Sequence, residues 1–316
     1  MRCILVGLGM LLATPANSAP ERLAVGVISR AGQITLTPGF SPDGRTAYFA
    51  QSDCAEIGRC PQRMTVARKS DGVWRRTERF KLQGDGEAAN GTPARVDFPS
   101  LSPDGKSLLF SWSVARADRS GLTINEDFEL YRLDLTKSGG VPVPFDTADI
   151  NRPRAGAIAR TLYYHNENSP VMTNAGDLYF WTERADGVGS RDVYVAPSDG
   201  KGGFQFARPL PPPINGKGMD TLGYVSPDGR LMLLAYPDRG GQGGSDIFVS
   251  RKVDGVWGLP LNLGPVVNSS ADDFGAVITP DGRDIAFSST RAFAGQRAGL
   301  IQVWTVPVAE VSALRR

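Results

Sequence analysis

Histidine is nearly absent from this chain, because His165 is the only one among 316 residues. One histidine disfavours a multi-histidine metal site and a Ser-His-Asp hydrolase. The G-x-S-x-G elbow of α/β-hydrolases is missing too. An excess of positive charge is also lacking, since 35 Lys and Arg stand against 33 Asp and Glu. Binding to a phosphate backbone needs a basic surface, so a nucleic-acid partner is not expected.

Long hydrophobic runs are lacking beyond the start of the chain. Arg2 precedes an apolar stretch from Cys3 to Leu12, and small residues follow up to Ala19. This pattern is typical of a secretory signal peptide, which divides the chain into a leader (1–19) and one mature domain (20–316). No later stretch approaches the ~18 apolar residues of a spanning helix, so no transmembrane segment is expected. The leader predicts a periplasmic or secreted protein.

Cysteine is scarce, and removal of the leader leaves only Cys54 and Cys60. Two close cysteines in an oxidising compartment predict a disulfide that closes a small surface loop. The alternative, a reactive thiol, would need a neighbouring base, and the sequence shows none.

Glycine and proline are plentiful by contrast, with 37 and 23 residues. They recur in a turn-plus-strand box at intervals of roughly 50 to 70 residues. Four copies read S-P-D-G or T-P-D-G and a weaker one reads T-N-A-G, and they begin at Ser41, Ser102, Thr173, Ser226 and Thr279. Proline, aspartate and glycine suit successive positions of a tight turn, and the apolar residues that follow suit a strand.

A second repeat lies later in each unit. The segment 246–257 aligns without a gap on 63–74, and both end in D-G-V-W. Each unit therefore reads as four short antiparallel strands, which is typical of a propeller blade. We predict an all-β fold, a single β-propeller of about five blades, with six left open. The segment Leu23–Ser29 is expected to pair with Ile301–Val306 and close the ring.

These boxes resemble the Pro-Asp, WD-like repeats of TolB-type β-propellers over about residues 36–308. The resemblance implies a propeller that acts in the cell envelope. TolB-type propellers usually have six blades, whereas five boxes are present here. Because propellers host many activities, the resemblance predicts the fold better than the function.

Acidic residues recur just before the boxes, where the first strand of a blade would line the central channel. Glu167, Asp220 and Asp273 stand six positions before a box, Asp97 stands five before, and His165 lies close to Glu167. One hypothesis is that these residues meet at the channel mouth and bind a basic group or a cation such as Ca²⁺. The other is that the carboxylates hydrogen-bond the neighbouring blade and only join the blades.

Other prominent residues are expected to be structural. Acidic residues that open the third strands should hydrogen-bond within the fold, and they are Glu129, Asp192 and Asp246. Tryptophans should pack between or inside the blades, and they are Trp74, Trp112, Trp181, Trp257 and Trp304.

For function, we predict a monomeric, non-catalytic binding module that docks a protein or peptide at the cell envelope. The TolB-like repeats, the leader and the lack of a separate catalytic domain support this hypothesis. The alternative is a carbohydrate-active enzyme of the glycosidase type, or a glycan-binding propeller, that uses the channel-mouth carboxylates. Apart from Ca²⁺, the sequence indicates no cofactor.

Overall fold

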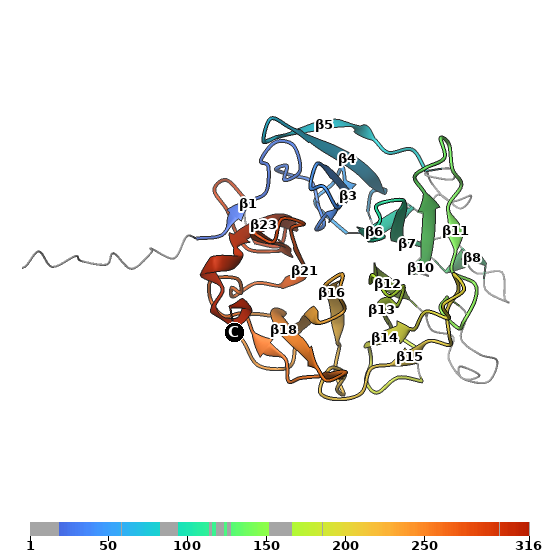
Figure 1. Ribbon diagram of the computed structural model, residues 1–316. Coiled ribbons are helices and arrows are strands. Elements are labelled where there is room, and N and C mark those ends of the chain that lie inside the picture. Colours follow the sequence, from blue (N-terminus) through green and yellow to red (C-terminus); the bar gives the residue numbers. More distant parts are fainter. Residues whose placement is uncertain are drawn as a thin grey trace, which may run out of the picture.

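The computed structural model describes residues 19–57, 59–82, 94–113, 116–117, 123–124, 128–151, 166–184, 186–296 and 298–315. The described strands form five antiparallel blades around a central axis (Figure 1). The predicted all-β propeller is therefore confirmed, with five blades and not six in this part of the chain. The predicted leader lies almost wholly outside the described residues. Within them, no helix has the length and apolar character needed to span a membrane.

Each blade contributes its strands in chain order from the axis outwards, except that the last blade ends on the N-terminal strand. Blade 1 contains β2 (Gly39–Phe40), β3 (Thr46–Ser52), β4 (Gln62–Ser70) and β5 (Val73–Arg79). Blade 2 contains β6 (Arg95–Leu101), β7 (Ser107–Ser113), β10 (Phe128–Asp134) and β11 (Val143–Pro144). Blade 3 contains β12 (Glu167–Met172), β13 (Leu178–Thr182), β14 (Asp192–Ala196) and β15 (Arg208–Pro209).

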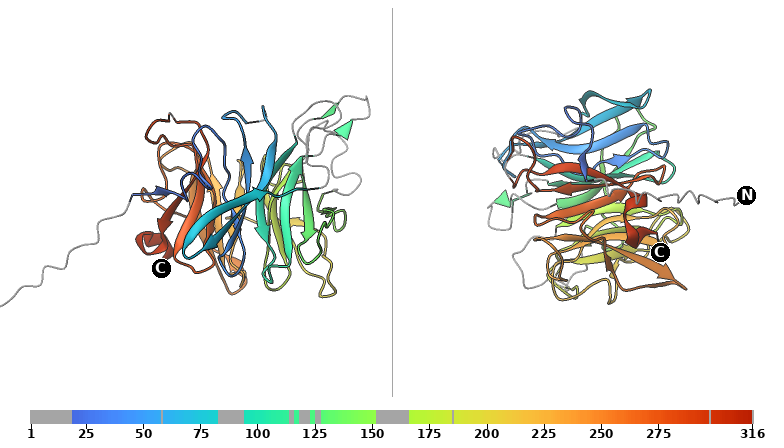
Figure 2. Two further views of the ribbon diagram at one scale, coloured as in Figure 1. Left: turned by 90° about the horizontal axis from the view of Figure 1, so that it is seen from above. Right: turned by 90° about the vertical axis from the view of Figure 1, so that its left-hand side faces the viewer.

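The remaining elements complete the ring. Blade 4 contains β16 (Thr221–Val225), β17 (Leu231–Tyr236), β18 (Asp246–Val253), β19 (Val256–Trp257) and β20 (Leu261–Asn262). Blade 5 contains β21 (Asp273–Ile278), β22 (Asp284–Ser289), β23 (Gln302–Pro307) and β1 (Glu21–Arg22). A small hairpin and two 3-10 turns lie outside the blades, and they are β8 (Arg116–Ala117), β9 (Thr123–Ile124), η1 (Val308–Glu310) and η2 (Ser312–Leu314). Figure 2 shows that the blade strands run roughly along the axis.

The ring closes between the two ends of the chain, as the sequence predicts, but through a shorter strand. β1 pairs antiparallel with β23, with Glu21 opposite Thr305. The predicted bounds Leu23–Ser29 are wrong, because that segment turns back on itself after Leu23. It still contacts the last blade, since the Leu23 amide and the Ser29 hydroxyl both donate to the Val303 carbonyl at 2.9 Å.

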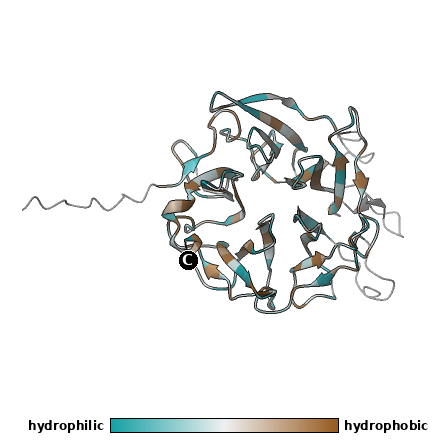
Figure 3. Cartoon of the chain, viewed as in Figure 1, coloured by the Kyte–Doolittle hydropathy of each residue, from teal (hydrophilic) through white to brown (hydrophobic). Residues whose placement is uncertain are grey.

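The blades are hydrophobic on both faces, and the core lies between them. In β17, Leu234 belongs to a cluster shared with Tyr179 of blade 3, whereas the preceding residue of the strand, Leu233, packs with Phe287 of blade 5. Alternate residues of one strand thus face opposite neighbours, and hydrophobic segments recur around the ring (Figure 3). A blade cannot bury both faces by itself, so its folding depends on its neighbours.

The S-P-D-G boxes form the predicted tight turns. In blade 4, the Ser226 hydroxyl accepts the Leu231 amide at 2.9 Å and donates to the Asp228 carboxylate. The Gly229 amide donates to the Ser226 carbonyl at 2.8 Å. The same bonds recur at the boxes that begin at Ser41, Ser102 and Thr279.

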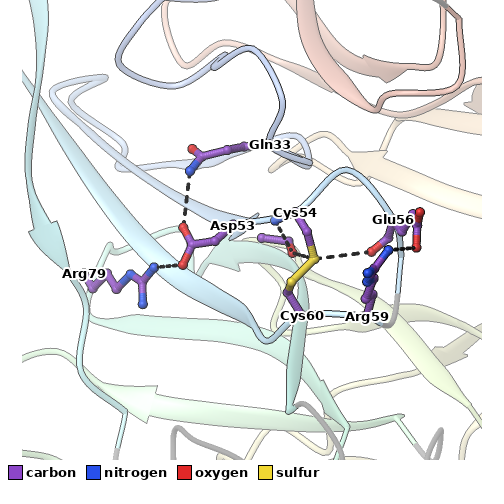
Figure 4. The surroundings of a disulfide bond; sticks show 8 residues. Gln33, Asp53, Cys54, Glu56, Arg59, Cys60 and Arg79 are labelled. Carbon is purple, nitrogen blue, oxygen red and sulfur yellow. Dashed lines mark hydrogen bonds and ion pairs between the residues drawn. A yellow bond between two sulfur atoms is a disulfide. The ribbon is translucent and has the colours of Figure 1, made fainter.

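The predicted disulfide between Cys54 and Cys60 is confirmed, with a Cα–Cα distance of 5.9 Å. Figure 4 shows the loop that it closes and the ion pair between Glu56 and Arg59 on that loop, at 3.0 Å. Asp53, next to the disulfide, accepts a hydrogen bond from Gln33 at 3.2 Å and pairs with Arg79 of β5. The disulfide thus closes the loop on itself, and the ion pair between Asp53 and Arg79 fixes its base to blade 1.

The turn bonds make the stability of the fold depend on pH. The Ser226 hydroxyl that donates to Asp228 lowers the pKa of that carboxyl below its ordinary 3.8. Because the folded pKa lies below the unfolded one, the stabilisation is complete above pH 3.8 and is lost as the pH falls through the folded value. We expect Asp228→Ala to lower the free energy of unfolding by about 1 kcal/mol at pH 7, and by less as the pH drops.

Urea unfolding followed by circular dichroism at a series of pH values measures this difference. Glu56→Ala is the control, since it removes only an exposed ion pair and should cost less than about 0.5 kcal/mol. A cost of Asp228→Ala that is equal at pH 7 and at pH 2.5 would contradict the role given to the carboxylate.

Candidate functional site

The carboxylates of Asp220 and Asp273 are fully buried, with exposed fractions of 0%. Oδ2 of Asp220 accepts the Gly216 amide at 2.6 Å, and its Oδ1 accepts from Arg239 at 2.9 Å. Burial raises the pKa of the Asp220 carboxyl, although the Gly216 amide and Arg239 oppose this shift. Arg239 and the Gly216 amide therefore compensate the negative charge of Asp220 within the protein.

Asp273 repeats these contacts one blade later. Its Oδ2 accepts the Ser269 amide and hydroxyl at 2.6 and 2.8 Å, and its Oδ1 accepts from Arg291 at 2.6 Å. Arg291 also donates to the Val267 carbonyl at 2.5 Å, so it ties the carboxylate to the segment that enters the blade. The carboxylate and the arginine together fix the chain between blades 4 and 5.

An asparagine completes each of these joints. Asn215 accepts the Val193 amide at 2.8 Å and donates to the Val193 carbonyl at 2.9 Å. Asn268 makes the same pair of bonds to Ile247, at 2.8 and 3.0 Å. Each asparagine thus binds the third strand of the preceding blade. We call the asparagine, the carboxylate and the arginine of one unit an interblade joint.

Blade 3 has the asparagine of such a joint, which the sequence comparison missed. Asn151 makes the same two bonds to Leu130 of blade 2, at 2.8 and 2.9 Å. Its signal is the pair Ile150-Asn151, which matches Ile214-Asn215. Extra residues between Asn151 and the box of blade 3 displace this pair from the expected spacing.

The other two predicted site carboxylates are also buried in polar networks. Glu167 accepts a hydrogen bond from Thr182 at 2.8 Å and has an exposed fraction of 0%. Asp97 is 6% exposed. It accepts one hydrogen bond from Asn168 of blade 3 at 3.4 Å and another from Gln62 of blade 1. Asp97 thus lies where three blades meet, one strand position further along than Glu167.

The contacts therefore match the hypothesis of carboxylates that join blades, and a ligand role for these four residues stays a prediction. The part of the chain that the structure describes holds no group of three or more His, Cys, Asp or Glu that could bind a metal ion. It thus offers the expected Ca²⁺ no cluster of acidic ligands. His165 lies outside the described residues.

Two of the acidic residues that open third strands, Asp192 and Asp246, make the expected hydrogen bonds within the fold. Asp192 accepts the Gly189 amide at 2.9 Å, and Asp246 accepts the Gln242 amide at 2.5 Å. The loop before each strand wraps tightly around the carboxylate. A Cβ at Gly241 would lie 1.4 Å from Oδ2 of Asp246, so only glycine fits there.

A cavity of about 340 Å³ lies on the axis at the end where the inner strands begin. We call it the mouth cavity. Its walls are mainly apolar and also hold polar side chains, and they include Ile57, Phe98, Trp181, Arg191, Met219, Thr221, Asp272, Phe274 and Thr290. Ile57 and Met219 are 57% and 45% exposed, which places them at the rim. Ile57 belongs to the loop that the disulfide closes.

Aromatic rings form the inner part of the mouth cavity. Phe98 and Phe274 pack edge to face with their centroids 6.2 Å apart. The guanidinium of Arg191 lies 4.2 Å from the centre of the Trp181 ring and pairs with Glu183. Trp181 is 8% exposed, so it belongs to the core as predicted, but it also lines the cavity, which the sequence did not indicate.

Asp272 is the one carboxylate among the described residues that line the mouth cavity. It is exposed, whereas its neighbour Asp273 is buried in a joint. Sequence comparison missed Asp272 because no other unit repeats it. Asp273 thus has a structural role, whereas Asp272 is accessible from the channel.

The chain matches no protein-family model and no curated protein sequence. The resemblance to TolB-type propellers therefore stays a prediction. Solved structures do share the fold. One is a thermostable family-43 glycoside hydrolase, at 11% identity and a TM-score of 0.53 over 88% of this chain and 91% of that chain.

Two further structures are similar to the same extent. The endo-arabinase from Bacteroides thetaiotaomicron VPI-5482 has 13% identity and a TM-score of 0.51 over 89% of this chain and 96% of its own. A protein of unknown function from Dyadobacter fermentans DSM 18053 has 13% identity and a TM-score of 0.52 over 94% of this chain and 85% of its own. At such identities the likeness shows the fold alone.

These comparisons contradict the predicted non-catalytic module that docks an envelope protein or peptide. Among the similar structures, those with a named activity and a TM-score above 0.5 are glycoside hydrolases, and none of them supports a protein partner. They agree better with the alternative, a carbohydrate-active protein. The interaction hypothesis failed because it relied on the box motif, which forms turns in any propeller of this kind.

The joints make a direct prediction about stability. We expect Asp273→Ala to cost about 3–5 kcal/mol, because it leaves Arg291, only 14% exposed, without its carboxylate. Asp272→Ala is the matched control, since it changes the adjacent exposed aspartate and should cost less than about 1 kcal/mol. Chemical unfolding of the two variants measures both values. Equal stability of the two variants would contradict the joint.

Proposed function

We propose that this chain is a carbohydrate-active protein of the glycosidase type, which binds a glycan in the mouth cavity. The observation that carries this proposal is the cavity itself, which is lined by aromatic rings and by polar groups. The C–H face of a sugar ring packs on aromatic side chains, whereas its hydroxyl groups need hydrogen-bond partners. The fold shared with glycoside hydrolases supports the same proposal.

The polar groups of the cavity suit sugar hydroxyls. Thr221 and Thr290 each offer a hydroxyl that can donate and accept, and Arg191 offers fixed donors beside Trp181. Asp272 can accept two hydroxyl bonds at once. These groups come from the links and inner strands of blades 3, 4 and 5, so a bound sugar would bridge them.

Cleavage of a glycosidic bond needs two carboxyl groups, one as acid and one as base or nucleophile. We assign these roles to Asp272, which lines the cavity, and to Asp97, which directly precedes the lining residue Phe98 on β6. Asp97 is hydrogen-bonded on two sides, so its position is held before substrate arrives. We expect Asp97→Asn to lower kcat with little change in KM, because a side chain that is mostly covered contributes little to substrate binding.

The predicted leader and the Cys54–Cys60 disulfide support a periplasmic or secreted site of action for the mature chain. There it would meet envelope or plant-type polysaccharides.

The test is a screen of the purified mature protein against envelope and plant polysaccharides, arabinan among them. Reducing-end release and calorimetry are measured in parallel. We expect binding or cleavage of at least one glycan, and a loss of about tenfold or more with Asp272→Asn, since a charge-assisted hydrogen bond contributes about 1.5–3 kcal/mol. The matched control is Asp254→Asn, an exposed aspartate in the outer turn of blade 4.

Two results would contradict the proposal. In one, every glycan stays intact and unbound while circular dichroism shows a folded protein. In the other, Asp254→Asn weakens binding or cleavage of the glycan as much as Asp272→Asn does.

A further inference from the structure

A second cavity, also of about 340 Å³, occupies the other end of the channel, on the face that carries the box turns. We call it the box-face cavity. Its lining comes from the inner strands of all five blades and from the box prolines. Pro42, Pro227, Pro280 and Asn174 are exposed, so the cavity communicates with solvent at this face. The proposed glycan function makes no use of it.

A narrow waist separates the two cavities. Phe98, Ser169 and Gly275 line both of them, and each lies within a break in the strand register of β6, β12 or β21. Phe98 adopts a φ of +35°, and its ring crosses to blade 5. A Cβ at Gly275 would lie 2.5 Å from Cε1 of Phe98, so the ring occupies the space that any other residue would fill.

The wall of the box-face cavity carries no charged side chain among the described residues that line it. Prolines are the most frequent lining residues, and they are Pro38, Pro42, Pro99, Pro103, Pro170, Pro227 and Pro280. Proline has no backbone N–H, so this wall offers few donors to a polar ligand. The two prolines inside inner strands, Pro99 and Pro170, lie in the register breaks of β6 and β12, where a proline is tolerated.

The turns of the four full boxes carry paired charges around the cavity. Each full box carries one aspartate and, two residues later, one lysine or arginine, as in Asp104 with Lys106, where the nitrogen and oxygen are 3.7 Å apart. In each of the four full boxes, this aspartate and this lysine or arginine balance each other. Neither an anion nor a cation would gain from entering an apolar cavity with such a rim.

Aromatic residues contribute to the lining of this cavity, although the Phe40 ring also packs on Trp74. Tyr224 and Phe40 line it from opposite parts of the ring. Burial raises the pKa of Tyr224 to about 12, so its hydroxyl is uncharged near neutral pH. Aromatic and proline rings are good packing partners for another flat ring.

We propose that the box-face cavity binds a small, uncharged, ring-bearing apolar ligand, independently of any glycan in the mouth cavity. The volume of about 340 Å³ lies at the lower end of the range for small-molecule pockets, which limits the ligand to about one or two fused rings. The Phe98 waist keeps the two ligands apart.

Blade 4 indicates how to block this site. Tyr224 stands two positions before its box, and Ser100 stands at the same place in blade 2. Both residues line the cavity. Ser100→Tyr places in blade 2 the side chain that stands at this position in blade 4; it removes the hydrogen bond from the Ser100 hydroxyl to the Pro170 carbonyl and fills the space that the ligand would use.

Two methionines report on the two cavities separately, because Met172 lines the box-face cavity and Met219 lines the mouth cavity. The full mature protein is labelled at its methionine methyl groups, and the signals are assigned with Met172→Leu and Met219→Leu. Indole is the uncharged probe. Indole-3-acetate and tryptamine carry the same ring with a negative and a positive charge. They therefore test the effect of ligand charge on the unaltered protein.

We expect indole to shift the Met172 methyl signal saturably, with a Kd below about 1 mM, while the Met219 signal stays in place. The charged analogues should bind about tenfold more weakly or worse, and Ser100→Tyr should remove the shift. The proposal is overturned if indole shifts neither methyl or only Met219, or if a charged analogue binds as well as indole. None of these outcomes depends on a glycan, so they leave the proposed function to its own test.

Discussion

The structure depends on one constraint, which is that every blade must bury both of its faces against its neighbours. Apolar residues alternate between the two faces of a strand, as Leu233 and Leu234 do, so the cores lie between blades and not within them. Packing of this kind is not directional, and polar joints supply the direction. The asparagine, carboxylate and arginine of each joint fix one blade to the third strand of the one before it. The ring then closes through β1 and β23.

The same constraint decides which residues are free for function. The joint carboxylates of Asp220 and Asp273 are fully buried and bonded to an arginine, so they cannot also bind a ligand without breaking the ring. The channel therefore takes its chemistry from residues between the joints, among them Asp272, Trp181 and Phe274. Phe98 gives this channel its particular shape, because its ring, seated on Gly275, divides one axial channel into two cavities of different character. One is partly polar and the other is uncharged.

The sequence predicted the fold well because the box turns and the strands are local features that repeat. Ser226, Asp228 and Gly229 form their turn from contacts within a few residues, so their pattern is readable without the rest of the chain. The site was harder, because the direction of a side chain depends on the register breaks in the inner strands. Asp97 was grouped with Glu167, yet it lies one position further along and meets other partners. Asp272 was not predicted as a site residue because it does not repeat, and the cavity around it forms only when distant blades meet.

The central claim is that a glycan binds between the joints, in the mouth cavity, and not at the joint carboxylates. The most direct measurement is a titration of methionine-methyl-labelled protein with soluble oligosaccharides from the polysaccharide screen. The account predicts that the Met219 methyl signal moves with glycan concentration, while the signals of Met172 and of the buried Met64 and Met232 do not. A glycan that binds while Met219 stays unmoved, or that shifts only the buried methionines, would contradict it.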